Sequence, residues 1–204
     1  MTHPFDKSYW ENHWASTTAQ GHPGLPANPY VRTETTHLPV GSALDAGCGT
    51  GSEALWLAAQ GWQVTGADIS ARALTIAAAR AAAADSPGRI EWLEKDLARW
   101  HPDRTWDLVI TSYAHPDIDQ LAFYQRIASW VAPGGTLLII GHLHGSDHGH
   151  DHPDGAVATQ AGIAELFSPP EWHIDASYER TRTVRADRRP TVLRDVIIRA
   201  RRAL

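Results

Sequence analysis

The sequence predicts an α/β fold in which a mostly parallel sheet is covered by helices on both faces. From residue 41 onward, apolar segments with strand character alternate with helical patterns, and this alternation is typical of parallel sheets. The first strand passes through a glycine turn, Ala43-Leu-Asp-Ala-Gly-Cys-Gly-Thr-Gly51, directly into a helical pattern, Glu53-Ala-Leu-Trp-Leu-Ala-Ala-Gln60. A strand, a tight turn and a helix in this order form the first unit of a nucleotide-binding α/β domain.

The other elements follow from local patterns. Residues 1–40 are polar and aromatic, with short helical patterns at 6–15 and 29–37, and they precede one domain over residues 41–204. Residues 72–84 are so rich in alanine that propensity alone favours a helix, and Ser86-Pro-Gly88 ends it. The pattern of residues 116–131 predicts a further helix. Two extended runs, 172–182 and 191–201, complete the chain.

Two acidic residues indicate which ligand the glycine turn binds. Asp45 stands at the end of the first strand, where its charge would repel a pyrophosphate but suits an ammonium group. A dinucleotide-binding loop would also carry its third glycine one position later, at Ser52. Seventeen residues beyond Gly51 a second strand ends in Asp68, and an acid at that point accepts hydrogen bonds from ribose hydroxyls. This set fits S-adenosylmethionine better than NAD.

Three later motifs extend the pattern in order: Glu94-Lys-Asp-Leu97, Trp106-Asp-Leu-Val-Ile-Thr-Ser-Tyr113 and Val131-Ala-Pro-Gly-Gly-Thr-Leu-Leu-Ile-Ile140. With the glycine turn and Asp68, they make the chain resemble a class I S-adenosylmethionine-dependent methyltransferase from about Gly41 to Arg201. The resemblance implies a Rossmann-like fold with a seven-stranded sheet, whose C-terminal runs form an antiparallel hairpin at one edge. It also implies that residues 1–40 act as a lid.

The resemblance assigns the cofactor-binding residues. Asp45 and the glycines of the turn would hold the methionine end of S-adenosylmethionine, and Asp68 its ribose. Asp96, Leu97 and Ile69 would surround the adenine, while Tyr113 would lie near the sulfur. The full set of expected cofactor residues is Trp14, Asp45, Gly47, Gly49, Gly51, Asp68, Ile69, Asp96, Leu97 and Tyr113.

Composition narrows the class of partner. The chain has 204 residues and a formal net charge of -5, which gives no reason to expect nucleic acid. It has no apolar stretch of membrane-spanning length, and its single cysteine, Cys48, cannot form an internal disulfide, so a cytoplasmic location is expected. A short chain with little beyond the core fold favours a small-molecule methyl acceptor, in a monomer or a homodimer.

The loop after the fourth strand offers a candidate base. His115 should lie just past Tyr113, where the methyl acceptor approaches, and a histidine can take a proton from an oxygen, nitrogen or sulfur nucleophile. The alternative is a loop histidine that only orients its neighbours. A base is not obligatory, because in-line alignment of the acceptor with the sulfonium can supply most of the acceleration.

The segment after the fifth strand is unusual. Gly141-His-Leu-His-Gly-Ser-Asp-His-Gly-His-Asp-His152 contains five of the twelve histidines, and imidazoles and carboxylates are ligands for divalent transition metals. Three interpretations stay open. In the first, His115, His142 and His144 form a catalytic or metal site. In the second, these histidines line a substrate pocket without metal, and in the third the segment is a solvated loop.

Two other classes of function compete with methyl transfer. One is a metal sensor or buffer, or a metalloid-detoxifying methyltransferase, that uses the histidine-rich segment. The opening Tyr9-Trp-Glu-Asn-His-Trp14 resembles that of thiopurine- and tellurite-type methyltransferases. The other is an enzyme that uses the positive sulfonium without moving its methyl group, for example in a cyclisation.

Overall fold

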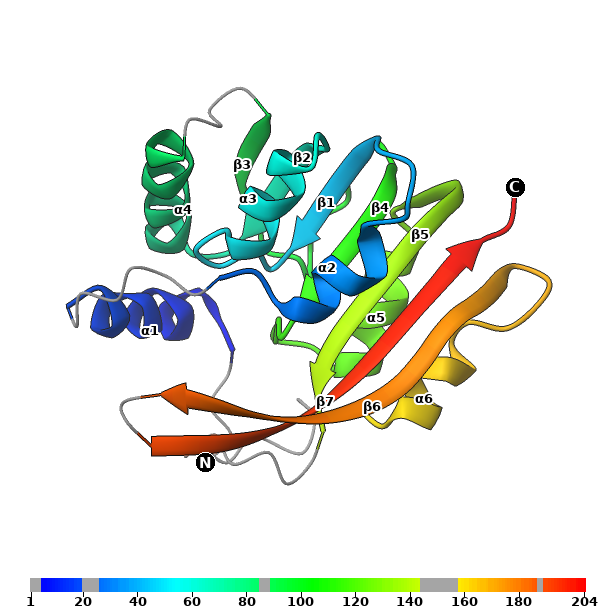
Figure 1. Cartoon of the computed structure of the whole chain (residues 1–204). Coiled ribbons are helices and arrows are strands. Elements are labelled where there is room, and N and C mark those ends of the chain that lie inside the picture. Colours follow the sequence, from blue (N-terminus) through cyan, green and yellow to red (C-terminus); the bar gives the residue numbers. More distant parts are fainter. Residues whose placement is uncertain (1–4, 20–25, 85–88, 144–157, 187–188) are drawn as a thin grey trace.

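A computed structural model describes residues 5–19, 26–84, 89–143, 158–186 and 189–204 (Figure 1). Seven strands form one sheet in the order β3-β2-β1-β4-β5-β7-β6. Their bounds are β1 Ser42–Ala46, β2 Gln63–Asp68, β3 Ile90–Glu94, β4 Trp106–Ser112, β5 Val131–His142, β6 Trp172–Ala186 and β7 Arg189–Arg202. Strands β1 to β5 pair in parallel, whereas β7 is antiparallel to both β5 and β6. The predicted α/β fold and its C-terminal hairpin are confirmed.

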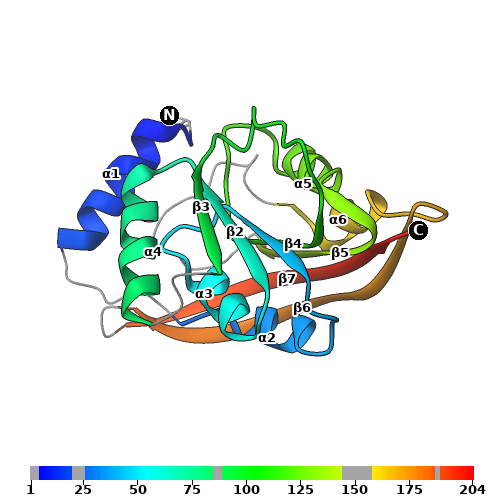
Figure 2. The same cartoon turned by 90° about the horizontal axis from the view of Figure 1, so that it is seen from above.

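Helices cover both faces of the sheet (Figure 2). On one face lie α2 (Pro29–Thr35), α3 (Ser52–Ala59) and α4 (Ala71–Ala83), and on the other lie α5 (Gln120–Ala128) and α6 (Gln160–Glu165). Helix α1 (Lys7–Ala19) packs on α4, and its Lys7 forms an ion pair with Glu94 at the end of β3. Helix α1 therefore lies near the carboxyl end of β3.

Each face of the sheet has its own apolar core. Phe123 and Ile127 of α5 pack with Leu44 and Val109 on one face, and Leu57 of α3 belongs to the cluster on the other. Neighbouring residues of a strand point to opposite faces, which puts the side chains of a single strand in both cores. The runs of apolar residues that predicted the strands are buried for this reason.

Capping side chains set the helix ends. The Ser70 hydroxyl accepts the Ala73 N–H at 3.1 Å, so α4 begins at residue 71, close to the predicted start. Helix α5 begins at residue 120, later than predicted, because the Asp119 carboxylate accepts the Ala122 N–H at 3.0 Å and fixes the first turn there. Its C-terminal end is also earlier than predicted, since Val131 already belongs to β5. Helix α6 was not predicted.

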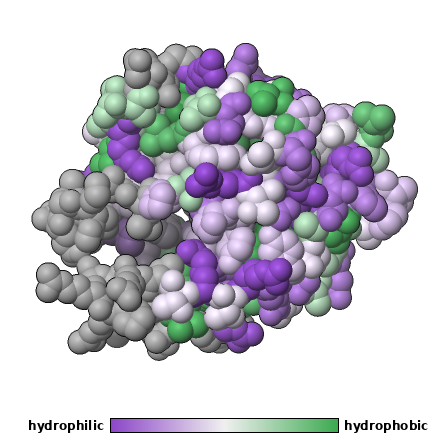
Figure 3. All heavy atoms as spheres, in the orientation of Figure 1, coloured by the Kyte–Doolittle hydropathy of each residue, from purple (hydrophilic) through white to green (hydrophobic). Residues whose placement is uncertain are grey.

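Few large apolar side chains are exposed on the described surface: Val40, Val192 and Leu204. Apolar residues appear in Figure 3 as small separate areas within a mostly hydrophilic face. Among the described residues, no helix combines the length and the apolar character needed to cross a membrane.

Candidate cofactor and acceptor site

The glycine turn between β1 and α3 has the left-handed backbone that its sequence predicts. The φ angles are 82° at Gly47, 50° at Gly49 and 79° at Gly51. A Cβ atom on Gly47 would lie only 2.3 Å from the Ala114 Cβ, so no larger residue fits there. The Gly47 N–H donates to the Ala67 carbonyl of β2 at 2.8 Å. The turn is thus fixed between β2 and the loop that follows β4.

Two carboxyl groups lie beside this turn at the start of α3. Asp45 is 1% exposed, and one of its oxygens accepts the Ala54 N–H at 3.1 Å. Burial, reinforced by the charge of Glu53, raises the pKa of Asp45 well above its ordinary value. Burial also raises the pKa of Glu53, although this carboxylate accepts the Asn28 N–H at 3.0 Å. A cation placed here would stabilise both ionised groups.

Asp68 ends β2, as predicted, and both of its oxygens face backbone amides. One accepts the Gly49 N–H at 2.8 Å and the other the Ser70 N–H at 2.9 Å. Burial raises the pKa of Asp68 despite these two bonds.

Nearby, Cys48 is 5% exposed, and burial raises the pKa of its thiol well above the ordinary value. Cys48 is therefore a packed side chain of the turn and not an activated nucleophile.

A cavity of about 340 Å³ lies beside Ile69, the residue after Asp68, and it brings two predicted adenine residues together. Ile69 and Asp96 line it, with Asp6, Lys7 and Ser8 on the side of α1. Leu97, the third predicted adenine residue, is 6% exposed within the apolar core and does not belong to the lining. The start of α1 and the residue before it thus form one wall of this cavity.

Trp14 of α1 lies against the glycine turn. A Cβ atom on Gly49 would lie 3.0 Å from the Trp14 ring, so the glycine permits close approach of the indole. His13 meets the same ring edge-to-face at a centroid distance of 5.0 Å. The cofactor contact of Trp14 stays a prediction.

Tyr113 follows β4 with a φ of 58°, the only positive φ at a non-glycine residue in the described chain. Its ring stacks on His142 at a centroid distance of 3.9 Å and an angle of 8°. Its hydroxyl oxygen accepts hydrogen bonds from Arg182 Nη2 at 2.9 Å and Asn28 Nδ2 at 3.1 Å. Burial and the charge of Asp195 raise the pKa of Tyr113, so the phenol stays protonated at neutral pH.

Asp195 of β7 belongs to the same cluster. It is fully buried, and its carboxylate accepts the Arg182 Nε–H at 2.8 Å, while the other oxygen lies 3.6 Å from His142 Nδ1. Burial would raise the pKa of Asp195, but the neighbouring His142 and the hydrogen-bonded Arg182 guanidinium outweigh it and hold the pKa below its ordinary value. The ionised carboxylate lies close to the His142 ring.

His115 is 6% exposed, and its hydrogen bonds define its tautomer. Gln120 Nε2 donates to the Ala114 carbonyl at 3.1 Å, so Gln120 Oε1 faces His115 Nδ1, also at 3.1 Å. A neutral His115 therefore carries its proton on Nδ1, and Nε2 is the basic nitrogen. The His115 and His142 rings lie 6.2 Å apart.

The histidine triad is only partly described. His144 lies outside the described residues, as does the rest of the histidine-rich segment to His152. Within the described ranges, no group of three histidine, cysteine, aspartate or glutamate side chains could hold a metal ion.

Several site residues escaped prediction: Asn28, Glu53, Arg182 and Asp195. Glu53 alone had a local signal, because it is an acid in the first turn of the helix that follows the glycine turn. The other three reach the site across large sequence separations.

The sequence is similar to those of known methyltransferases. A family profile described as a methyltransferase domain matches residues 43–135. Probable thiol methyltransferase 2 of Arabidopsis thaliana is 29% identical over 136 residues, which cover 64% of this chain and only 60% of that protein.

Two solved structures share the fold. The N-methyltransferase NodS of Bradyrhizobium japonicum WM9, in complex with S-adenosyl-L-homocysteine, superposes with a TM-score of 0.63 at 19% identity, covering 85% of this chain and 84% of that one. The cyclase SpnF has a TM-score of 0.72 at 18% identity, covering 100% and 98%. Residues 43–135 are thus similar to a methyltransferase domain, and the chain as a whole shares the fold of these two solved structures.

Proposed function

We propose that this protein transfers the methyl group of S-adenosylmethionine to a small oxygen, nitrogen or sulfur nucleophile. The observation that carries the proposal is the set of three acids around the glycine turn, the buried Asp45 and Asp68 and the half-buried Glu53. Burial raises the pKa of each, so the site favours a ligand with positive charge and hydroxyl donors. The ammonium and ribose of S-adenosylmethionine meet both requirements.

The described residues suit the parts of this cofactor in order along the site. Asp45 and Glu53 would bind the ammonium group, Asp68 the ribose, and the cavity beside Ile69 and Asp96 the adenine. When bound, S-adenosylmethionine supplies a methyl group on a cationic sulfur. Trp14 and Tyr113 would flank that sulfur, since one ring covers the glycine turn and the other follows β4.

The acceptor side offers two bases. His115 presents Nε2 as its basic nitrogen, and His142 is held between the Tyr113 ring and the Asp195 carboxylate. Either could remove a proton from the acceptor as the methyl group moves to it. The name of the Arabidopsis thaliana relative makes a thiol the first acceptor to test.

The test combines binding with product analysis. Isothermal titration calorimetry should detect binding of S-adenosylhomocysteine by the wild type and weaker binding by Asp68→Asn, with the exposed Asp103→Asn as the matched control. Mass spectrometry should then detect S-adenosylhomocysteine formed from S-adenosylmethionine with one member of a panel of thiols, hydrosulfide, phenols and amines. Cofactor binding without turnover by any acceptor class would favour the non-transferring role of the sulfonium.

The metal-handling alternative has a separate test. Elemental analysis of untagged, natively purified protein, before and after chelation, measures retained metal. A stoichiometric metal that survives dialysis would make the histidine-rich segment part of the function. Cofactor binding that is unchanged by chelation, with no retained metal, would leave methyl transfer to an ordinary nucleophile.

A further inference from the structure

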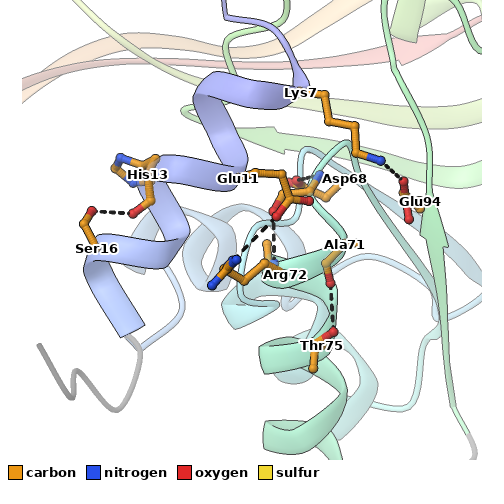
Figure 4. Close-up of polar contacts among 11 residues, drawn as sticks. Lys7, Glu11, His13, Ser16, Asp68, Ala71, Arg72, Thr75 and Glu94 are labelled. Carbon is orange, nitrogen blue, oxygen red and sulfur yellow. Dashed lines mark hydrogen bonds and ion pairs between the residues drawn. The ribbon is translucent and has the colours of Figure 1, made fainter. Parts of the chain in front are cut away.

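Glu11 reaches from α1 toward Asp68 and Arg72 (Figure 4). One of its carboxylate oxygens, Oε2, lies 3.6 Å from Arg72 Nε, at the start of α4. The other, Oε1, is buried and has no hydrogen-bond partner among the described residues. A buried acceptor without a donor is costly, so this oxygen is suited to receive a hydrogen bond from a ligand.

The Glu11 carboxylate lies close to that of Asp68 (Figure 4). Burial is the main cause of the raised pKa of Asp68, but the charge of Glu11 raises it further. Two carboxylates on different elements therefore lie close together, and no side-chain hydrogen bond between them is present among the described residues. Each Asp68 oxygen already accepts one backbone N–H, whereas Glu11 Oε1 accepts none.

A ribose presents two adjacent hydroxyls, and each is a donor that needs an acceptor when it is buried. We propose that Glu11 is a second ribose ligand, whose Oε1 accepts one hydroxyl of S-adenosylmethionine while Asp68 accepts the other. This inference rests on the proposed function, because it requires the adenosyl cofactor in the site. It predicts that α1 contributes directly to cofactor affinity.

Another role for Glu11 would be purely mechanical. Helix α1 is also fastened by the Lys7–Glu94 ion pair and by Trp14 on the glycine turn, so Glu11 could act only by holding α1 through Arg72. The Glu11–Arg72 ion pair joins two partly exposed side chains, and such pairs contribute little to stability. The two roles differ in one respect: only the ribose ligand should respond to the hydroxyls of the bound molecule.

The experiment uses S-adenosylhomocysteine and its 2′-deoxy and 3′-deoxy analogues, titrated by calorimetry into the full chain. Glu11→Gln should weaken S-adenosylhomocysteine about 5- to 30-fold, as expected for loss of a charged hydrogen-bond partner. With the analogue that lacks the hydroxyl bound by Glu11, the wild type and Glu11→Gln should agree within about twofold. Arg72→Gln, the matched control, keeps the carboxylate and removes only the ion pair, so it should change affinity less than about threefold.

Each outcome decides the question. An equal loss in Glu11→Gln for all three ligands, or a loss matched by Arg72→Gln, would show a mechanical role and overturn the inference. No loss at all would overturn it as well. Should Glu11→Gln be poorly folded by circular dichroism, Glu11→Ala and the wild-type affinities for the two analogues give the same comparison. Failure of the proposed function is distinguishable, because the wild type would then not bind S-adenosylhomocysteine.

Discussion

Replacing Gly47 by alanine should both destabilise the protein and weaken cofactor binding. The left-handed φ of 82° costs an alanine about 1–2 kcal/mol. Its Cβ would also lie 2.3 Å from the Ala114 Cβ, well inside the ~3.5–4.0 Å of a normal carbon contact, and such overpacking costs about 1–3 kcal/mol. The sum, about 2–5 kcal/mol, lowers the melting temperature by ~4–20 °C in a chain of this length.

Gly61→Ala is the matched control, measured by thermal unfolding and by titration with S-adenosylhomocysteine. Gly61 also has a positive φ, 101°, but its Cβ would meet Val40 only at an ordinary 3.6 Å. It should therefore show the backbone cost alone, ~2–8 °C, and bind the ligand normally. Equal melting temperatures and equal affinities in the two variants would refute the steric reasoning about Gly47.

Further substitutions test the acids and bases of the site. Asp68→Ala should weaken S-adenosylmethionine binding by about 1–3 kcal/mol in calorimetry; unchanged affinity would remove Asp68 from the site. If His115 is the base, His115→Ala should lower turnover ~10²–10⁴-fold with little loss of cofactor affinity, and His142→Ala is the comparison. Near-normal rates in both variants would mean that alignment of the acceptor, without a base, accelerates the reaction. Asp195→Asn should lower the free energy of unfolding by about 1–3 kcal/mol at pH 7. Because the folded-state pKa of Asp195 is low, that deficit should shrink as the pH falls below about 4. Asp45→Asn should instead raise the free energy of unfolding of the ligand-free protein at pH 7. The folded-state pKa of Asp45 is raised, so a neutral amide is favoured over the ionised carboxylate at this position. This gain should fade toward about pH 4. Denaturant titrations across this pH range check both.

The parts of the site that lie close together in the sequence could be predicted from it. Asp45 and the glycine turn occupy a few consecutive residues, and Asp68 ends the next strand. Parallel strands bring their carboxyl ends to one edge, so a reader of the sequence can place these groups together without knowing the packing. Ile69 and Asp96 share a cavity for the same reason.

The residues that the sequence did not reveal act over long separations. Arg182 reaches Tyr113 across 69 positions, and Asn28 reaches it across 85. Asp195 is one of many charged residues in an arginine-rich tail, and only the pairing of β7 with β5 puts it opposite His142. Such contacts depend on strand order and register, which no local pattern encodes. The backbone strain at Tyr113 is hidden for the same reason.

The position of β7 has a consequence for how the protein folds during synthesis. β7 is the last of the strands along the chain, yet it lies between β5 and β6 (Figure 1), and Val196, Ile197 and Ile198 in it are fully buried. A ribosome delivers the five parallel strands first, but the open edge of β5 stays unpaired until residues up to about 201 have emerged. The sheet therefore cannot be completed while the final strand is still in the exit tunnel, and the exposed edge of β5 is where a chaperone would be needed.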